Sequence, residues 1–546
     1  MNRQLRSIWF WLSALALILL AIFLIYPLLT VLTGSFGSGG RNGWVILAHE
    51  PKYGAAILNT IVLAALVTTT ATLVGVPLAY VAARFDFPGK GIVAVLPLIT
   101  LVIPEVIAAQ TWLMMLGNNG LITRWLGGFA IQIPSFYGWP GLITVMTFTY
   151  YTYIYIGTLA AIRGFDVQLE EAAQSLGASP ARSRLTVMLP VVMPAVLASA
   201  LLVFTLVAGN FATATILGGR VPLLSVLTYQ AAVAEGRFDP VMQSTLATVS
   251  ILLVMIVLLA QRWIIARSRH EITQGRGAAA RRLHGLPGLG IGLFSGLLVL
   301  ISLLPLGSIL IGAFTVSRGP VMRWGEWTSA HLERLVRTAP DPVINTLLYS
   351  AAATAIGIAF GTVLSYLIVK KRTVLTSALD YISALPLALS GTVIGIGLIL
   401  SFNTGILPLT GTATIIVLAY IVRRLPFGIR NASSTLYNIP NSIEEASISL
   451  GVPPLATFFK VVLPLMVPAI AAAAVLTWTT TIAELSASII VYSGGRETMP
   501  IQIYKLIESN LMAQASAYGL VLVAVILIPI IIATRIFKID LFAGKA

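Results

Sequence analysis

The sequence predicts an all-α polytopic membrane protein whose twelve transmembrane helices form two parallel six-helix repeats. Three observations lead to this prediction. The 546-residue chain has a mean hydropathy of +0.94 and only 10% charged residues, whereas a soluble domain has about 25% charged residues. Long apolar stretches recur along the chain, and one polar phrase occurs twice, 274 residues apart.

Apolar stretches long enough to cross a membrane define the twelve predicted helices. A helix rises about 1.5 Å per residue, so roughly 20 apolar residues are needed to cross about 30 Å of hydrocarbon. Such stretches lie at 8–32, 55–83, 92–116, 141–162, 191–216, 241–266, 290–314, 345–369, 378–402, 408–425, 465–490 and 517–534. The first follows Arg3 and Arg6, as a signal peptide would, but its apolar core exceeds the roughly 7–15 residues of such peptides. We expect it to be a retained span.

The basic residues predict the orientation of these helices. With a cytoplasmic N-terminus, 23 of the 34 Lys and Arg residues fall on the cytoplasmic side and 11 outside, which agrees with the positive-inside rule. Both termini are therefore expected in the cytoplasm. The net charge of +15 reflects this bias and attraction to anionic lipid, and we see no nucleic-acid footprint in it.

An internal repeat divides the chain into halves. The segment 59–80 aligns with 345–366, which places Asn59, Gly75 and Tyr80 over Asn345, Gly361 and Tyr366. The predicted divisions are a first half at 1–265, a basic, Gly-rich cytoplasmic linker at 266–289 and a second half at 290–546. Because each half has an even number of spans, the two keep the same orientation and are expected to be related by a pseudo-two-fold axis along the membrane normal.

The polar phrase is the better-preserved part of the repeat. "EEAAQSLGASPARSRLTVMLP" (170–190) and "EEASISLGVPPLATFFKVVLP" (444–464) are identical at ten of 21 positions. Glu and Ala favour helix, Gly177 and Gly451 suit left-handed helix ends, and Pro180 and Pro454 suit the starts of following helices. Each phrase therefore predicts a short helix, a turn and a second short helix on the cytoplasmic face; an amphipathic connector on the lipid headgroups is the alternative.

At these residues the chain resembles the permeases of bacterial ABC importers, whose EAA loop has this pattern, with Ser447 replacing the second Ala. The resemblance covers both halves and implies the type I importer permease fold. It also implies that two copies of a cytoplasmic ATPase dock on the two loops. The residues expected to couple to the ATPase are Glu170, Glu171, Ala172, Gly177, Glu444, Glu445, Ala446 and Gly451.

The chain is expected to be a transport subunit, not an enzyme. A phosphate-cradling loop needs Gly-x4-Gly-Lys-Ser/Thr, and neither Gly-Lys pair, Gly89–Lys90 or Gly544–Lys545, continues in that way. ATP and Mg²⁺ are therefore expected on the partner ATPase, with no cofactor in this chain. The sequence has no Cys, which excludes disulfides and thiolate metal sites, and we predict no metal site.

The sequence indicates the substrate less specifically than it indicates the class of transporter. The fusion of two permeases, with "VRRLPFGIRNAS" (422–433) before the second motif and "TIAELSASIIVYSGG" (481–495) after it, is similar to ferric-iron importer permeases. Similar fused or paired permeases carry thiamine, aminoethylphosphonate, polyamines or sugar phosphates. The resemblance thus implies an inner-membrane importer of a small solute, with ferric iron as the first candidate.

A few polar residues in the predicted spans are candidates for the translocation pathway. Glu105 and Glu484 are the carboxylates there, and Asn210 stands opposite Glu484 in the repeat. Intramembrane ionisable groups usually face a pathway or a partner helix, and carboxylates without a fixed cation favour a cationic substrate. Glu484 as a hydrogen-bonded structural residue is the alternative. Hydroxyls for a hard cation come from Tyr150, Tyr151, Tyr153 and Tyr155, for which aromatic packing is the alternative.

Outside the membrane, the resemblance implies a periplasmic binding protein that delivers substrate to the loops after the fifth and eleventh spans. The repeated Gly-Gly-Arg sequences there make Arg220 and Arg496 the predicted contacts, and turns before re-entrant helices are the alternative. An ion-gradient-driven secondary transporter also fits twelve spans in two parallel halves. The doubled cytoplasmic motif and the few intramembrane charges argue against it, and no site supports a membrane-embedded enzyme.

Overall fold

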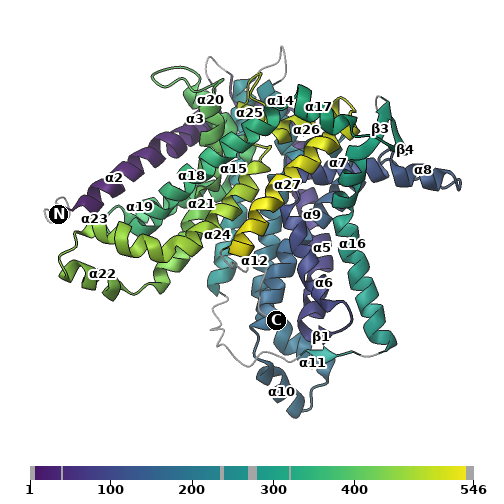
Figure 1. Cartoon of the computed structure of the whole chain (residues 1–546), viewed down its shortest axis with the longest axis horizontal. Helices are drawn as coiled ribbons and strands as arrows, with labels where there is room; N and C mark the ends of the chain where they lie inside the picture. Colours follow the sequence, from purple (N-terminus) through teal and green to yellow (C-terminus); the bar gives the residue numbers. More distant parts are fainter. Residues whose placement is uncertain are drawn as a thin grey trace.

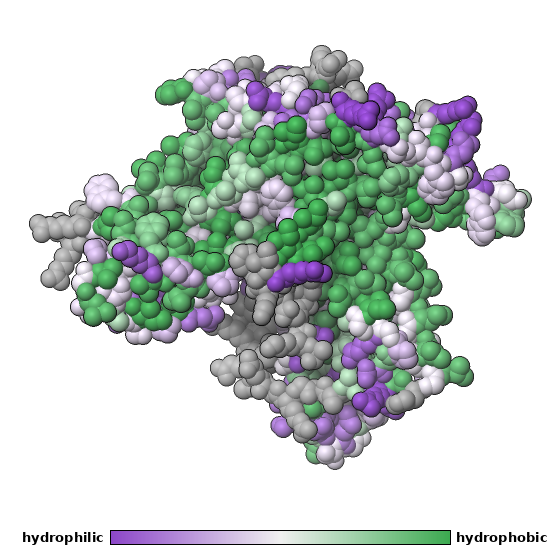
Figure 2. Space-filling model, viewed as in Figure 1, coloured by the Kyte–Doolittle hydropathy of each residue, from purple (hydrophilic) through white to green (hydrophobic). Residues whose placement is uncertain are grey.

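The computed structural model describes residues 7–37, 41–233, 239–267, 280–283, 285–318 and 321–536. In these residues the chain is almost entirely helical (Figure 1). Most of the predicted linker, 266–289, lies outside the described residues. Figure 2 shows a broad apolar surface between hydrophilic surfaces at the top and bottom of the view, as expected of a protein that spans a bilayer.

The first half begins with a helix that runs through α2 (Ile8–Leu20), the π-helical turn η1 (Ala21–Ile25) and α3 (Tyr26–Gly34). The following elements are α4 (Gly43–His49), α5 (Pro51–Arg84), α6 (Lys90–Val95), η2 (Leu96–Val102), α7 (Glu105–Leu116), α8 (Leu121–Gly127), α9 (Trp139–Arg163), α10 (Val167–Ser175), α11 (Pro180–Ser183), η3 (Arg184–Met188), α12 (Leu189–Ala208), α13 (Ala212–Leu217), α14 (Leu224–Val233) and α15 (Pro240–Arg267).

The second half repeats this order with an added hairpin. Its elements are α16 (Leu286–Phe314), β3 (Thr315–Arg318), β4 (Val321–Trp327), α17 (Ala330–Thr338), α18 (Asp341–Val369), α19 (Thr376–Ala384), η4 (Leu385–Ala388), α20 (Gly391–Phe402), α21 (Ala413–Asn438), α22 (Asn441–Ser449), α23 (Pro454–Thr457), η5 (Phe458–Val462), α24 (Leu463–Ile482), α25 (Ser488–Val491), α26 (Met499–Glu508) and α27 (Met512–Ile536). Strands β3 and β4 pair antiparallel. Strand β1 (Phe85–Asp86) pairs in parallel with β2 (Arg281–Arg282), which joins the first half to the chain just before the second.

The predicted spans fall on helices of three kinds. Among the described residues, eight helices are long and apolar enough to cross a membrane. Two more predicted spans, 92–116 and 378–402, are bent pairs, and the remaining two are α9 and α21, of 25 and 26 residues. Those last two carry Tyr and Thr or Arg side chains and pack chiefly against α5 and α18.

Four predicted spans are not the continuous helices that the hydropathy indicated. The pair η2–α7 bends by 107° and the pair η4–α20 by 114°. In the first, the break falls at Ile103–Pro104, where the residue before a proline is forced out of helical geometry. The predicted spans 191–216 and 465–490 end earlier, at Ala208 and Ile482, because polar side chains start new short helices after each.

The tenth predicted span is also longer than expected. It was placed at 408–425, but α21 continues to Asn438, through the two arginines at which the apolar stretch ends. Pro426 lies inside this helix without ending it. The helix therefore carries Arg423 and Arg424 in its middle, among the packed helices of the second half.

The two halves exchange their first helices. Buried residues of α2, Ala16 and Leu20, pack with Leu364, Leu367 and Leu379 of the second half. In return, α16 of the second half packs against α6, η2 and α7 of the first. The apolar core is therefore shared between the halves.

Candidate functional site

The two polar phrases form the predicted helix–turn–helix loops, here called the first coupling loop (166–183) and the second coupling loop (440–457). Asp166 caps α10 by accepting the Gln168 N–H, and the left-handed glycines Gly177 (φ +90°) and Gly451 (φ +85°) follow α10 and α22. The next helices, α11 and α23, begin at Pro180 and Pro454. Both coupling loops lie on the lower side of the molecule in Figure 1, apart from each other. The predicted local structure is confirmed.

Each Glu–Glu pair is split between the inside and the outside of the protein. The first members, Glu170 and Glu444, are 5% and 4% exposed, whereas Glu171 and Glu445 are exposed. The residues just before the left-handed glycines are among the most exposed apolar side chains: Leu176 is 91% exposed and Leu450 86%. The outer surface of each loop therefore exposes a leucine side chain next to a carboxylate.

The buried carboxylates bind basic residues at the ends of the second span of each half. Glu170 Oε2 accepts a hydrogen bond from Arg84 Nη2 at 2.5 Å. Glu444 Oε2 accepts from Lys371 Nζ at 2.7 Å and from the Tyr366 hydroxyl at 2.9 Å. The sequence showed these three residues only as part of the basic cytoplasmic loops and the repeat, so their role as partners of the motif was missed.

A partly buried polar cluster, here called the polar centre, lies where the helices break. It contains Glu105, Tyr150, Asn210, Arg423, Arg424 and Glu484. Glu105 lies within electrostatic reach of Glu484 and both arginines. The cluster therefore brings the pathway candidates of the two halves near each other, with Glu484 paired to both guanidinium groups and Glu105 bound to Tyr150.

In the first half, Asn210 performs two tasks. Its Oδ1 accepts the backbone N–H of Thr213 at 2.9 Å and so caps α13. Its Nδ2 donates to the Tyr150 hydroxyl at 2.7 Å, which in turn donates to Glu105 Oε1 at 2.5 Å. The amide thus starts the short helix and also connects it to the bend at Glu105.

In the second half, Glu484 takes the place of Asn210. Its Oε1 accepts the N–H of Ala487, the residue just before α25, at 3.0 Å and also accepts from Arg423 Nη1. Its Oε2 accepts from Arg424 Nη2 at 2.7 Å. The expectation of pathway carboxylates without a fixed cation is wrong, because Glu484 binds two arginines that the sequence placed at the end of a span.

Gly391 makes room for this ion cluster. It occupies the place of Glu105 at the start of the second bent helix. A Cβ at Gly391 would lie 1.8 Å from Arg423 Nη1 and 2.8 Å from the Ala487 nitrogen. The acidic group therefore sits on the bent helix in the first half and on the helix break in the second.

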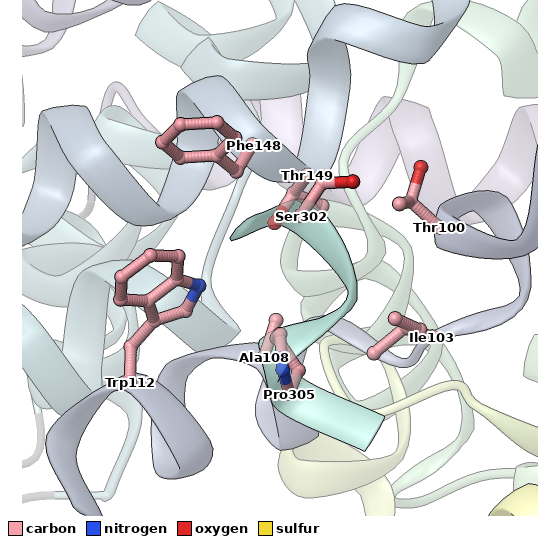
Figure 3. Close-up of a pocket in the computed structure, with 8 residues that line it drawn as sticks. All are labelled: Thr100, Ile103, Ala108, Trp112, Phe148, Thr149, Ser302 and Pro305. Carbon is pink, nitrogen blue, oxygen red and sulfur yellow. The ribbon is translucent and has the colours of Figure 1, made fainter. Parts of the chain in front are cut away.

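Three of the four candidate tyrosines of α9 use their hydroxyls in hydrogen bonds within the protein, and Tyr153 packs against the Tyr150 ring with ring centroids 6.2 Å apart. The Tyr151 hydroxyl bonds Ser302 Oγ at 3.0 Å, and the Tyr155 hydroxyl donates to the Ala94 carbonyl at 3.1 Å. A cavity beside the bend, drawn in Figure 3 with Trp112 and Phe148 on its wall, measures about 10 Å³, enough for about one water molecule. Within the described residues, no group of three His, Asp or Glu side chains could hold a metal ion.

The predicted outer contacts lie after the short helices. Arg220 is exposed beside the left-handed Gly219, and Arg496 is partly buried after Gly495. Next to Arg496, Lys505 Nζ donates to Glu497 Oε1 at 2.9 Å. Burial acts to raise the pKa of Glu497, but hydrogen bonds from Lys505 and the backbone outweigh it, so the pKa falls below its ordinary value.

Two repeated bundles, with matching helix–turn–helix loops on one side and matching helix breaks inside, define a two-half ABC importer permease. The chain belongs to the family described as "Binding-protein-dependent transport system inner membrane component", whose model matches it twice, at residues 75–270 and 353–539. The first match contains the first coupling loop and the second contains the second. The protein is thus a multi-pass membrane transport subunit with both permease halves in one chain.

Similar proteins differ in the length over which they match. A ferric transport system permease protein of Actinobacillus pleuropneumoniae is 26% identical over 94% of this chain and 76% of its own. A putative ferric transport system permease protein of Haemophilus influenzae is 27% identical over 90% and 79%. A probable sulfate transport system permease protein of Nephroselmis olivacea is 27% identical over 47% of this chain and 90% of its own.

Proposed function

We propose that this permease imports ferric iron delivered by a periplasmic binding protein and is driven by two copies of a cytoplasmic ATPase. The observation that carries the ATP-driven class is the pair of coupling loops, which share fold, burial pattern and side of the molecule. Substrate would cross between the halves, past the polar centre. Arg220 and Arg496 would contact the binding protein on the opposite side.

The exposed surface of each coupling loop supports docking of an ATPase. Leu176 and Leu450 project next to the exposed Glu171 and Glu445. An apolar side chain exposed to this extent on two equivalent loops suits burial in a partner's cleft. ATP and Mg²⁺ would bind to that partner, because this chain has no phosphate-cradling sequence.

The choice of ferric iron has support in the relatives that match over most of this chain and are named as ferric permeases. An oxyanion is the second candidate, and the arginines of the polar centre favour it. Arg423 and Arg424 already hold a carboxylate through charge-assisted hydrogen bonds, and such bonds also suit sulfate or phosphonate oxygens. The sulfate permease relative matches one half of the chain.

Reconstitution tests both parts of this proposal. The permease, its ATPase and its binding protein are placed in proteoliposomes, and uptake of radiolabelled ferric iron and radiolabelled sulfate is measured with and without ATP. We expect ATP-dependent iron uptake that requires the binding protein. Sulfate uptake without iron uptake would show that the substrate is sulfate and not ferric iron. ATP-independent uptake driven by an ion gradient would overturn the assignment to ATP-driven transporters.

A further inference from the structure

We propose that Arg84 and Lys371 are positioning residues that fix the coupling loops to the ends of α5 and α18 through the buried carboxylates Glu170 and Glu444. The inference rests on the proposed function, because it concerns how the movement of a docked ATPase reaches the membrane helices. In this arrangement, the first Glu of each pair binds the permease itself, and the outer surface of the loop is available to bind the ATPase.

In the first half, the guanidinium group of Arg84 lies at the junction of three segments. The side chains of Arg84 and Glu170 are 11% and 7% exposed, and their ion pair measures 2.5 Å. The same guanidinium group donates to Met188 Sδ at 3.3 Å and lies 5.9 Å from the Phe165 ring. Ser183 Oγ also donates to the Glu170 carbonyl at 3.2 Å. Arg84 therefore touches the chain before, within and after the first coupling loop.

In the second half, a different set of residues binds the buried carboxylate. Glu444, with a side chain 5% exposed, accepts from Lys371 and Tyr366. The Lys371 ammonium lies 5.4 Å from the Tyr366 ring and 5.6 Å from the Trp9 ring, and Trp9 packs edge-on against Tyr366 at 5.2 Å. Since Trp9 belongs to α2, the second coupling loop is also tied to the first half of the chain.

The two cations stand at different positions of the repeat. This difference indicates that each buried carboxylate requires a cation. The repeat that aligns Tyr80 with Tyr366 places Arg84 over Lys370, the neighbour of Lys371. Lys370 is used elsewhere, since its Nζ donates to the Ile439 carbonyl and to Asn441 Oδ1 at the start of α22. Had duplication alone preserved the pair, the equivalent residue would bind Glu444. Each half instead supplies a cation from its own position.

Each buried carboxylate also depends strongly on its cation. In both halves the second carboxylate oxygen, Oε1, is buried and has no hydrogen-bond partner within the described residues. Removing the cation would leave a buried, largely uncompensated charge, which proteins tolerate poorly. The loop would then have to move or its carboxyl group take up a proton, and either change separates it from the span.

The positions of α5 and α18 explain how the two ion pairs would transmit movement of the coupling loops. Helix α5 packs along α9 and α12, and α18 packs along α21 and α24. These neighbours carry Tyr150, Asn210, Arg424 and Glu484 or end next to them. A displacement of a coupling loop therefore reaches the polar centre through one continuous set of packed helices. Such coupling needs contacts that differ between two states.

Charge reversal with matched controls tests the inference. Arg84→Glu and Lys371→Glu are compared with Arg163→Glu and Arg372→Glu, which reverse exposed charges near the loops but outside them. Arg84→Lys and Lys371→Arg keep the charge, and the exchanged pair Arg84→Glu with Glu170→Arg restores opposite charges. For each variant, reconstituted with ATPase and binding protein, the solute imported per ATP hydrolysed is measured.

We expect the Arg84→Glu and Lys371→Glu variants to hydrolyse ATP while solute imported per ATP falls roughly ten-fold or more. The exposed controls and the charge-keeping variants should stay within about two-fold of the parental ratio, and the exchanged pair should exceed Arg84→Glu. Parental ratios in both reversals, or equal defects in the charge-keeping variants, would overturn the inference.

A separate measurement distinguishes failure of the proposed function. In the variant with Leu176→Asp and Leu450→Asp, we expect the ATPase to dissociate during purification. If the ATPase still co-purifies, docking on these loops is wrong. If it dissociates while the charge reversals leave the ratio unchanged, only the positioning role is wrong.

Discussion

At the scale of single residues, Gly391 lies in tight surroundings next to the polar centre. A methyl group there would overlap the Arg423 guanidinium group and press on the backbone at Ala487. We therefore expect Gly391→Ala to lower the free energy of unfolding by about 1–3 kcal/mol, the usual cost of overpacking. Thermal unfolding in detergent, followed by tryptophan fluorescence, measures the effect.

The matched control is Gly357→Ala, in the middle of α18. Among the residues that the structure describes, no atom outside the adjacent residues and the local helix backbone lies within 4 Å of a Cβ at this position. The substitution should be neutral, or stabilise by up to about 1 kcal/mol because alanine favours helix. Equal unfolding temperatures for the two variants would show that the Arg423 side chain is not held against Gly391.

The two pathway carboxylates should respond differently to neutralisation. Glu484→Gln leaves two arginines without their carboxylate, and losing one member of a buried ion cluster costs about 3–5 kcal/mol. Glu105→Gln still offers a carbonyl to the Tyr150 hydroxyl, so we expect about 1 kcal/mol. Transport and thermal stability should therefore fall much further for Glu484→Gln.

Adding Arg424→Gln to Glu484→Gln removes one unpaired charge and should recover part of the lost stability. Uptake assays on properly assembled protein check the functional half of this prediction. Parental transport by Glu484→Gln would exclude Glu484 from the pathway and from its gating.

At the scale of the element, the left-handed glycines should control the coupling loops. Gly177→Asp and Gly451→Asp place a side chain at φ +90° and +85°, which costs roughly 1 kcal/mol. Within the described residues, no atom beyond the adjacent residues lies within 4 Å of a Cβ at either position, so we expect any larger effect to come from a docked partner. We expect inserted protein that has lost transport and has lost either the ATPase or its stimulation by loaded binding protein.

Gly177→Asn is the control for charge, because Asn tolerates the left-handed conformation and is neutral. It should retain more activity than Gly177→Asp if charge in the docking cleft is the main defect. Normal ATPase co-purification, stimulation and transport in both Asp variants would leave the loops as inert surface connectors.

At the scale of the whole molecule, the orientation can be measured with cysteines, since the chain has none. Single cysteines at Ser175 and Ser268 should react only with reagents added from the cytoplasm. One at Ser317, in strand β3 of the β3–β4 hairpin, should react only from outside. Ser268 lies outside the described residues. Labelling of Ser175 and Ser317 from the same side would overturn the predicted topology.

The exchange of first helices predicts that the halves assemble without a covalent connection. If the chain is cut at residue 272, the co-expressed pieces should co-purify, because α2 packs on the second half and α16 on the first. Deleting residues 1–36 from the first piece should weaken this association, since it removes the contacts of Trp9, Ala16 and Leu20. Unchanged association after the deletion would contradict the shared core.

The sequence by itself determined the class, the repeat and the local form of the coupling loops. Each of these depends on short-range properties: apolar length for the spans, and helix formers followed by Gly and Pro for the loops. Gly177 and Gly451 could be assigned their backbone conformation because a helix end of this kind requires it locally.

Only the tertiary structure decided which polar groups meet. Hydropathy placed Glu484 in a continuous span and Arg424 at the end of another, yet the two form an ion pair at a helix break. Glu170 and Glu171 are adjacent and identical in type, but one is buried and the other exposed. These differences depend on contacts between residues about 60 to 90 positions apart. A buried charge persists only where such a distant partner compensates it. The hydrophobic pattern of a single segment cannot identify that partner.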